Sequence, residues 1–462
     1  MKILLVKPYN LSDHIQPSLG LGYLATAIRD KADIKLLDCI KDNVRIREFV
    51  QIIRSYKPDF VGFQCYTFDL KFIKEALREC KCFNAGMVTV IGGPHPSAVP
   101  KESFEYFKDS LDFIFVGEAE NGLPLLIGRL KNNFFGDFSD IPGLAWKDNG
   151  KVRINPQEFI EDLDSLGMPA WDLIRPEEYP ESQHGAFYKK FPIAPIMATR
   201  GCPFSCTFCA GNIIAGKKIR KHSCDFIIKQ IKYLYDEHKI REFHIIDDNF
   251  SFDTFYAKDF LKRLINLNLD ISWATPNGVR IDSLDEELIK LMKESGLYLI
   301  SLGIESGSDR ILKLMKKNTT IKKIRAAIKL IHRFEINIAG FFIVGFPGET
   351  KEEIRKTIDF SLGLGLIRAN YFTFLPFPGT ESYNELVASN QIKNVNWDKF
   401  YFMSAPYAPK GISRKQLKSL NRLAFLRFYS RPQIMLKNLL GIKSFRHFRF
   451  LFKRFLHWII MN

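Results

Sequence analysis

Cysteine is scarce in this chain. Eight cysteines are spread over 462 residues, too few and too unevenly spaced for the disulfide framework of a secreted protein. A long apolar run is also missing near the start, because the short run 3–6 is followed at once by Lys7 and Pro8, unlike the hydrophobic region of a signal peptide. Both features lead us to expect a protein of the reducing cytoplasm, with a first strand near residue 3.

Acidic residues are absent from residues 401–462, which hold thirteen Lys and Arg. The formal charge of +16 is therefore local, since the other 400 residues carry 54 basic against 51 acidic side chains, a balance of +3. A charge confined to one end does not indicate a nucleic-acid-binding surface over the whole chain. We expect no nucleic-acid partner.

Short apolar runs alternate with amphipathic segments through residues 1–130, which predicts a doubly wound parallel α/β sheet with helices on both faces. The runs lie at 3–6, 34–38, 60–65, 87–93 and 113–117. Ligands of such sheets bind beyond the carboxyl ends of the strands. The loops after the fourth and fifth runs carry Gly92, Gly93, His95, Gly117 and Glu118, which we expect at that edge. Ordinary turns are the alternative interpretation of both loops.

Six further runs follow residue 190 and are separated by helix-length amphipathic segments. They lie at 193–199, 242–248, 271–278, 298–306, 336–348 and 370–379. This repeat predicts a barrel or open barrel, whose active site would lie at the carboxyl ends of the strands. Residues 131–190 have little periodicity and are expected to form a small hairpin and a linker.

Three of the eight cysteines, Cys202, Cys206 and Cys209, lie close together in the segment TRGCPFSCTFCA. Thiolates bind zinc and iron-sulfur clusters, and one loop can deliver several of them to one centre. A structural zinc site would require a closed set of four ligands, yet the next cysteine is the distant Cys224. Three thiolates on a four-iron cluster would leave one iron open to another ligand.

With Phe208, the triplet forms the pattern Cys-x3-Cys-x-Phe-Cys, which resembles the signature of radical S-adenosylmethionine (SAM) enzymes. The resemblance implies a 4Fe-4S cluster on the three cysteines, with its open iron chelating the amino and carboxylate groups of SAM. It also implies reductive cleavage of SAM to a 5'-deoxyadenosyl radical that abstracts a substrate hydrogen. An external electron donor such as flavodoxin or ferredoxin is expected.

The resemblance extends to residues after the later strands. The segment IIDDNF places Asp247, Asp248 and Asn249 where family members hold the methionine amino group, which needs oxygen acceptors. By the same resemblance, further residues are expected near the ribose, carboxylate and adenine of SAM: Arg280, Glu305, Ser306, Ile343 and Gly345. Taken singly, a Glu or Arg near a strand end is more often part of a surface ion pair.

The first half resembles the branch of that family in which a cobalamin-binding domain precedes the radical domain. The similar segments are PSLGLGYLA (17–25), IGGPHPSAVP (91–100), FVGEAE (115–120) and PFPGT (376–380). The Asp-x-His-x-x-Gly element that gives cobalt an imidazole is absent, since Asp13 and His14 are adjacent. We therefore expect a cobalamin between the first sheet and the mouth of the radical domain, with neither His95 nor His244 bound to cobalt.

These patterns divide the chain into four parts. We predict a flavodoxin-like, cobalamin-binding domain over 1–135, a linker with a hairpin over 136–190, a radical SAM core with a partial (β/α)6 barrel over 191–400, and a basic amphipathic helical region over 401–462.

The resemblance favours an enzyme that methylates an unactivated carbon of a small or lipid-like substrate; no residue is assigned a direct catalytic role. An anaerobic oxidative cyclase acting on a tetrapyrrole-like substrate is the alternative. A non-catalytic iron-sulfur or corrinoid sensor is a hypothesis from another class. An RNA-modifying methylthiotransferase would need further cluster cysteines, and Cys39, Cys65, Cys80 and Cys82 do not form a convincing set.

The end of the chain, FRHFRFLFKRFLHWIIMN, alternates basic with large apolar residues. Lys453, Arg454 and His457 interrupt it well short of the roughly 20 apolar residues of a membrane-spanning helix. Two interpretations stay open: an interfacial helix on the inner face of a membrane, which would make the protein peripheral, or a helix folded back on the protein.

Overall fold

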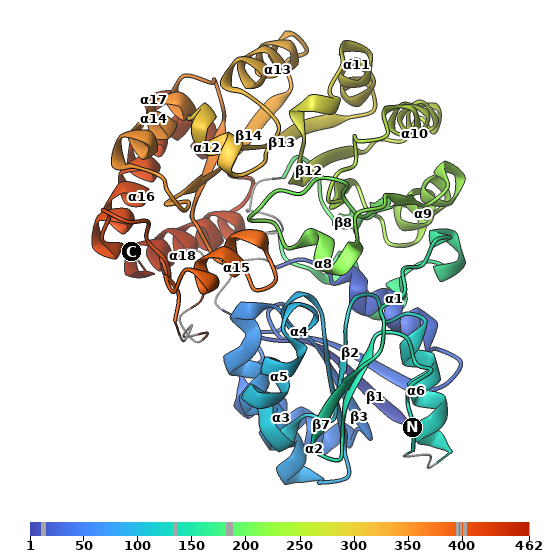
Figure 1. The fold of residues 1–462 in the computed structure, drawn as a ribbon. Helices are drawn as coiled ribbons and strands as arrows, with labels where there is room; N and C mark the ends of the chain where they lie inside the picture. The colour runs from blue at the N-terminus through green and yellow to red at the C-terminus, as the bar shows by residue number, and fades with distance from the viewer. Residues whose placement is uncertain are drawn as a thin grey trace.

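A computed structural model of the chain describes residues 1–10, 15–132, 136–181, 188–393, 397, 400 and 404–461, with only the backbone at 453–455 and 457–461. Asp13 and His14 lie outside the described residues. Two parallel sheets, each covered by helices, make up the two halves of the molecule, with the N-terminal half below and the C-terminal half above in Figure 1. The predicted α/β architecture is confirmed.

The first sheet has the strand order β2-β1-β3-β4-β5-β6-β7, of which the first five are parallel. These five are β1 (Lys2–Lys7), β2 (Asp33–Asp38), β3 (Phe60–Gln64), β4 (Val88–Gly92) and β5 (Phe113–Phe115). Their helices are α1 (Leu19–Ala27), α2 (Ile46–Tyr56), α3 (Leu70–Phe83), α4 (Pro94–Ala98), α5 (Pro100–Phe107) and α6 (Gly122–Lys131).

Both faces of the first sheet are buried, which explains why its strands are apolar at nearly every position. In β1, Leu4 and Val6 pack into a cluster with α2, α3 and α5, whereas Ile3 and Leu5 pack into a second cluster with α1 and α6. Successive strand residues point to opposite faces, so one apolar run supplies both cores.

The predicted hairpin forms, but it belongs to the first sheet rather than to a linker. Strand β6 (Leu144–Asp148) pairs antiparallel with β5, and β7 (Lys151–Ile154) pairs with β6. Trp146 lies opposite Phe113 and is buried. The first sheet therefore continues past residue 135 to Ile154, because the edge of β5 would otherwise leave its backbone groups unpaired.

The second sheet contains six parallel strands in the order β15-β14-β13-β12-β11-β8. They are β8 (Ile193–Ile196), β11 (Glu242–Ile245), β12 (Ser272–Val279), β13 (Leu297–Glu305), β14 (Asn337–Val344) and β15 (Arg368–Thr373). Its two edge strands do not pair with each other, so the sheet is an open barrel, as the sequence pattern predicted. A small antiparallel pair, β9 (Thr199–Arg200) and β10 (Arg220–Lys221), stands beside it.

Helices on the outer face of the second sheet begin where the sequence offers a capping side chain. Ser223, Asp253, Asp285, Ser308, Thr320 and Thr350 each accept a hydrogen bond from a backbone N–H in the first turn of the helix that follows. These helices are α9 (Cys224–Glu237), α10 (Thr254–Asn266), α11 (Glu286–Glu294), α12 (Asp309–Leu314), α13 (Ile321–Arg333) and α14 (Lys351–Leu362).

Shorter helices fill the connections. They are α7 (Trp171–Ile174), α8 (Gly211–Ala215) and α15 (Glu381–Ala388), with 3-10 turns η1 (Thr67–Asp69), η2 (Lys108–Ser110), η3 (Leu163–Leu166), η4 (Pro176–Glu178) and η6 (Ile281–Ser283).

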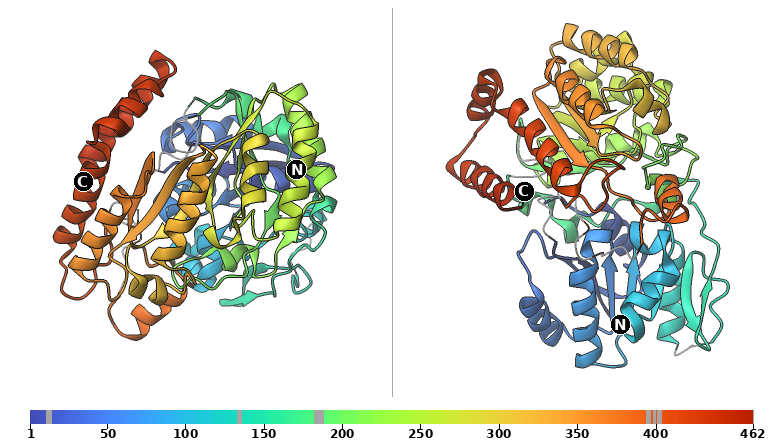
Figure 2. Two further views of the ribbon diagram at one scale, coloured as in Figure 1. Left: turned by 90° about the horizontal axis from the view of Figure 1, so that it is seen from above. Right: turned by 60° about the vertical axis from the view of Figure 1, so that its left-hand side comes forward.

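The C-terminal region is helical, as predicted, and its first helix belongs to the core. Leu417, Ala424 and Phe428 of α16 (Arg414–Tyr429) are buried in the main cluster of the second sheet, beside β15. The chain then forms α17 (Pro432–Leu440) and α18 (Phe445–Met461), which lie at one edge of the molecule (Figure 2). Within the described residues, no helix combines the length and the hydropathy needed to cross a membrane.

Candidate functional site

The carboxyl-end edges of the two sheets face each other. Helix α4, directly after β4, contacts α8, which follows the cysteine loop. Gly379, at φ +79°, lies where the two helices meet: a Cβ there would stand 2.7 Å from Cδ1 of Ile213 and 3.2 Å from Cβ of Ala98. The positive φ favours glycine here, and a side chain would press on both helices. Any ligand of one edge therefore lies close to the other.

The cysteine loop is fixed at both ends. Strands β9 and β10 pair on either side of it, and the N–H of Cys202 donates to the carbonyl of Gly216 at 3.2 Å. Gly201 has φ +96°, and a Cβ there would stand 2.2 Å from the carbonyl oxygen of Lys218. Thr207 donates its N–H to the carbonyl of Met315, which ties the middle of the loop to the end of α12.

The three thiols lie within one another's electrostatic reach and are accessible to different degrees. Cys202 and Cys206 are half-buried, whereas Cys209 is exposed. Burial raises the pKa of Cys209 to about 11, and that of Cys202 in the same direction, so a metal centre would be needed to hold these thiolates. Cys224, by contrast, is buried in the core of the second sheet.

The surroundings of the thiols fit an anionic cluster. The N–H of Gly211 donates to Sγ of Cys209 at 3.4 Å, and Nη1 of Arg280 lies 3.8 Å from Sγ of Cys206. Among the described residues, no group of three His, Cys, Asp or Glu side chains is arranged to hold a single metal ion. A four-iron cluster is larger than one ion, and its thiolate ligands stand farther apart.

Asp248 lies against the cysteine loop. A Cβ added to Gly211 would stand 3.5 Å from Sγ of Cys209 and 3.7 Å from Oδ1 of Asp248, so the two side chains flank the same glycine. Asp248 is accessible to solvent, yet burial raises its pKa, as expected for a carboxyl group inside a cleft. Its carboxylate can accept hydrogen bonds from an ammonium group placed over the cysteines.

Asn249 is the next residue, and its side chain is unusual. It is 1% exposed, and neither its Oδ1 nor its Nδ2 has a hydrogen-bond partner among the described residues. Buried amides are normally hydrogen-bonded, so this unsatisfied amide is available to a polar ligand. Asn249 therefore offers an oxygen acceptor that no described residue occupies.

Asp247 does not share this position. It is buried, and its carboxylate accepts hydrogen bonds from the N–H groups of Ala198 and Thr199 and from Oγ1 of Thr199, all at 2.8 Å. Burial raises its pKa to about 7, although these hydrogen bonds act in the opposite direction. The side chain that we expected to contact the methionine amino group instead ties the end of β11 to the strand that enters the cysteine loop.

Positive charge lies beneath the cysteine loop. Arg280 is buried, stacks on the Phe204 ring at 3.6 Å, and donates to Asp282 and to the carbonyl of Lys317, both at 2.6 Å. Lys317 pairs with Glu305 at 2.7 Å, and this ion pair raises the pKa of Lys317 although burial opposes it. Arg280 and Glu305, expected near SAM, are thus engaged with protein partners that stabilise the loop.

The remaining residues expected near SAM lie at the ends of β13 and β14. Ser306 is buried, and its Oγ lies 3.3 Å from Oγ1 of Thr357, so the hydroxyl faces α14. Ile343 and Phe208 pack on one apolar cluster, which places an apolar wall beside the last cysteine. Gly345, at φ +80°, leaves no room for a side chain, because a Cβ would stand 2.6 Å from Leu417.

The edge of the first sheet that faces the cysteine loop carries an aromatic pair beside charged groups that already have protein partners, Lys7 with Asp38 and Asp69 with Asn10. After β3, the rings of Tyr66 and Phe68 stack at 5.3 Å with an interplanar angle of 2°. Tyr66 is 39% exposed, yet burial, together with the charges of Asp69 and Asp248, raises its pKa to about 12. Tyr66 follows β3, whose neighbour β4 leads into α4, and α4 contacts α8, so this phenol lies at the edge that faces the cysteine loop. An accessible aromatic floor of this kind fits a large, flat cofactor.

Gly92, Gly93 and His95 support this floor. Gly93 has φ +111°, and a Cβ there would stand 3.1 Å from the carbonyl oxygen of Cys65. His95 is buried, its Nδ1 lies 3.1 Å from Oγ1 of Thr67, and burial lowers its pKa to about 4. The imidazole is therefore a neutral partner of Thr67 in η1. His244 is likewise buried and bonded to Glu242.

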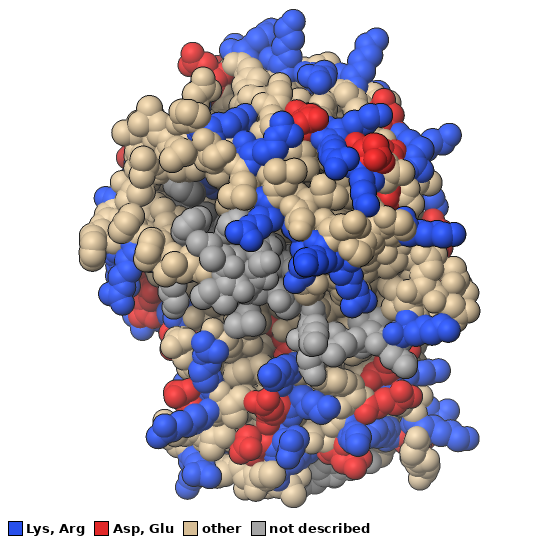
Figure 3. Space-filling view, turned by 90° about the vertical axis from the view of Figure 1, so that its left-hand side faces the viewer, with Lys and Arg blue, Asp and Glu red and all other residues tan. Residues whose placement is uncertain are grey.

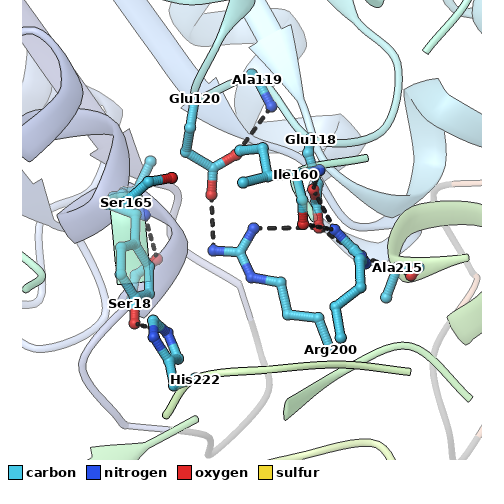
Figure 4. Close-up of polar contacts among 12 residues, drawn as sticks. Ser18, Glu118, Ala119, Glu120, Ile160, Ser165, Arg200, Ala215 and His222 are labelled. Atoms are coloured by element: carbon cyan, nitrogen blue, oxygen red, sulfur yellow. Dashed lines mark hydrogen bonds and ion pairs between the residues drawn. The ribbon is translucent and has the colours of Figure 1, made fainter. Parts of the chain in front are cut away.

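Glu118 differs from its predicted role. Its carboxylate accepts hydrogen bonds from Nη1 and Nη2 of Arg220 at 2.7 and 2.8 Å, and Arg200 lies 3.1 Å away. Glu120 pairs with Arg200 at 2.8 Å (Figure 4). These side chains are almost fully buried, so the group expected to touch cobalamin is saturated by protein and joins the two halves. Gly117 is also packed, with a Cβ position 2.2 Å from Gln157.

Sequence reasoning missed two parts of the site. Tyr66 and Phe68 follow the third predicted strand, and their position after that strand was the available signal. Glu120, Arg200 and Arg220 carried no local signal, because their partners lie 80 to 102 residues away in the chain.

The chain is similar to known proteins over both of its halves. A family model described as the radical SAM superfamily matches residues 196–361, and one described as a B12 binding domain matches residues 12–127. The chain is 32% identical over 461 residues to a protein of Pyrococcus horikoshii named as an uncharacterized methyltransferase, covering 98% of this chain and 97% of that protein.

Two further proteins bear on the comparison. The anaerobic magnesium-protoporphyrin IX monomethyl ester cyclase of Cereibacter sphaeroides is 26% identical over 427 residues, covering 90% of this chain and 68% of the cyclase. The fold is similar to that of TsrM, a radical SAM methyltransferase of Kitasatospora setae solved with cobalamin and a [4Fe-4S] cluster. For TsrM the TM-score is 0.69 and the identity 18%, covering 84% of this chain and 78% of TsrM.

The near full-length relative, the two family models and the thiol-lined cleft lead to one conclusion. The chain belongs to the radical SAM enzymes that carry an N-terminal B12-binding domain, and its cofactors are a 4Fe-4S cluster, SAM and cobalamin.

Proposed function

We propose that this enzyme transfers a methyl group to an unactivated carbon of a small or lipid-like substrate. The observation that carries the proposal is the opposition of two different edges across one cleft, thiols and Asp248 on one side and the Tyr66–Phe68 pair on the other. A substrate between them would meet both cofactor sites. When bound, the cluster and SAM supply a hydrogen-abstracting radical, and cobalamin supplies the methyl group.

In this proposal the residues of the chain hold and orient the cluster and SAM. Cys202, Cys206 and Cys209 bind the cluster, and Asp248 with Asn249 accepts hydrogen bonds from the methionine ammonium. Arg280 and the Lys317–Glu305 pair keep the cysteine loop in place from below. Ile343 and Phe208 offer an apolar wall that excludes water beside the last cysteine.

On the opposite edge, Gly92, Gly93 and His95 set the height of the floor on which Tyr66 and Phe68 receive the cobalamin. The neutral His95 stays bonded to Thr67 and leaves the metal without an imidazole. An external reductant of the flavodoxin or ferredoxin class is required to reduce the cluster, because nothing else in the proposal supplies an electron.

The experiment is anaerobic reconstitution of the chain with iron, sulfide and cobalamin, followed by turnover with SAM labelled in its methyl group. Candidate lipids, tetrapyrroles and small metabolites are screened by mass spectrometry. Methyl transfer moves the label into product and forms 5'-deoxyadenosine alongside S-adenosylhomocysteine. A product that gains no label contradicts methyl transfer.

Oxidative cyclisation is the second candidate, since one relative is named as an anaerobic cyclase. It would form 5'-deoxyadenosine with a tetrapyrrole and leave the methyl label in methionine. The same screen therefore separates the two reactions.

A further inference from the structure

Exposed apolar side chains are concentrated at the C-terminal end. Among the described residues, ten of the nineteen exposed large apolar side chains lie on α16, α17 and α18, which make up a small part of the chain. Scattered apolar residues are normal on a protein surface, but a concentration of this kind marks an interaction site.

Four of these side chains form one stripe on α18. Phe445, Phe448, Phe452 and Leu456 are spaced by three, four and four residues, so they share one face of the helix. They are 80%, 44%, 51% and 43% exposed. The rings of Phe445 and Phe448 lie 6.4 Å apart, and those of Phe448 and Phe452 lie 6.1 Å apart. We call these four residues the outer stripe.

A different face of α18 is docked on the protein. His447 is 1% exposed, and its ring lies 5.3 Å from the ring of Tyr188. Ser444 donates from Oγ to Glu181 at 3.0 Å. The helix therefore folds back on the molecule by this face, while the outer stripe is left uncovered by any described residue. The two interpretations of the tail are not exclusive.

Helix α17 adds apolar surface just before the outer stripe. Its Ile434 is buried, whereas Met435, Leu436, Leu439 and Leu440 are 50%, 58%, 61% and 74% exposed. The two helices stand at the edge of the molecule (Figure 2).

Positive charge borders this apolar surface. Lys437, Lys443, Arg446 and Arg449 are exposed, and none of them forms an ion pair with a described residue. Residues 401–462 contain no acidic side chain at all. Figure 3 shows that on this side of the molecule basic side chains outnumber acidic ones in the upper half, whereas both signs are mixed in the lower half.

We propose that the outer stripe and the exposed residues of α17 dock the enzyme on an anionic membrane surface. An apolar face rimmed by cations matches the boundary between acyl chains and anionic headgroups. A second copy of the chain is a poorer partner, since it would bring the same unpaired cations together. The helix lies on the membrane and does not cross it. This inference does not depend on methyl transfer.

The test is flotation of the full chain with vesicles of phosphatidylcholine alone or with about 30% of the anionic lipid phosphatidylglycerol added. We expect binding to the anionic vesicles at low salt and weaker binding at high salt. The charge variant Lys443→Gln/Arg446→Gln/Arg449→Gln should lower the partition coefficient about a hundredfold. The stripe variant Phe445→Ser/Phe448→Ser/Phe452→Ser should remove binding to both kinds of vesicle.

The matched control is Phe83→Ser/Phe255→Ser, which removes two exposed phenylalanines from the rest of the surface, one of them 87% exposed. It should bind as the unaltered chain does, and circular dichroism should show all variants folded. Equal flotation of the stripe and control variants, or no flotation of the unaltered chain at low salt, overturns the proposal. A dimer in light scattering that the stripe variant abolishes would assign the face to a second copy instead.

Discussion

The two edges of the cleft differ in chemistry. The edge of the second sheet buries charge in pairs, with Arg280 on Asp282 and Lys317 on Glu305 beneath accessible thiols. The edge of the first sheet offers stacked aromatic rings, glycines and a neutral histidine. A zwitterionic ligand on an anionic cluster needs the first environment, and a large planar cofactor suits the second. The difference offers each cofactor a separate environment at one of the two facing edges.

Replacing the thiols at the edge of the second sheet should have the largest effect. We expect Cys202→Ala, Cys206→Ala or Cys209→Ala to abolish SAM cleavage, because each removes one of three cluster ligands. Iron content and 5'-deoxyadenosine formation are the measurements. Cys224→Ala is the control and should retain both, since that thiol is buried elsewhere. A triple variant that keeps its iron would contradict the assignment.

The buried ion pairs of Glu118 and Glu120 with Arg200 and Arg220 can be broken without substituting a residue that is proposed to hold a cofactor. Glu118→Ala leaves Arg220 buried without its carboxylate, which should reduce the free energy of unfolding by about 3 to 5 kcal/mol. Denaturant unfolding measures it. Lys218→Ala removes the exposed pair with Glu161 and should cost less than about 1 kcal/mol. Equal losses in the two variants would show that the buried network does not carry the junction.

A substitution at Gly93 should alter the edge of the first sheet without altering the cysteine loop. In Gly93→Ala the new Cβ meets the backbone of Cys65 while φ is +111°, so the floor must shift. We expect cobalamin affinity to fall more than tenfold with iron content unchanged, as followed by absorbance after anaerobic reconstitution. Gly128→Ala lies in α6 with no atom within 4 Å of the new Cβ and should change neither quantity. Parallel loss of iron and cobalamin would mean that the edges are not separable.

The pH dependence of stability tests whether His95, at the edge of the first sheet, is neutral in the folded protein. Because burial lowers the pKa of His95 to about 4, the unfolded chain binds a proton between pH 6.5 and 4 that the folded chain does not. Stability should therefore fall as the pH drops through this window, by about 1 kcal/mol from pH 7.5 to 5.5. His95→Asn should remove that part of the slope, measured by denaturant unfolding at both pH values. An unchanged slope would show that His95 binds a proton as readily in the folded chain as in the unfolded chain.

The sequence predicted those features that a local pattern carries. Eleven apolar runs became strands of two sheets, and the spacing of Cys202, Cys206 and Cys209 predicts that these three residues are the cluster ligands. What it could not predict depends on contacts between distant segments. Asp247 and Asp248 are adjacent and chemically identical. Asp247 accepts hydrogen bonds from Thr199, whereas Asp248 lies near the thiol of Cys209. By its position after β5, Glu118 was expected to contact a ligand of the first sheet. Its actual partner, Arg220, lies 102 residues away in the chain and could not be predicted from local sequence.

The bonds between Glu118, Glu120, Arg200 and Arg220 also constrain how such enzymes can be recombined. Arg200 stands two residues before the first cysteine, while its carboxylate partners belong to the other half of the chain. A chimera that joins the first half of this enzyme to a radical half without these arginines would leave Glu118 and Glu120 buried without their cations. Exchange of the two halves therefore requires an incoming half that supplies both arginines.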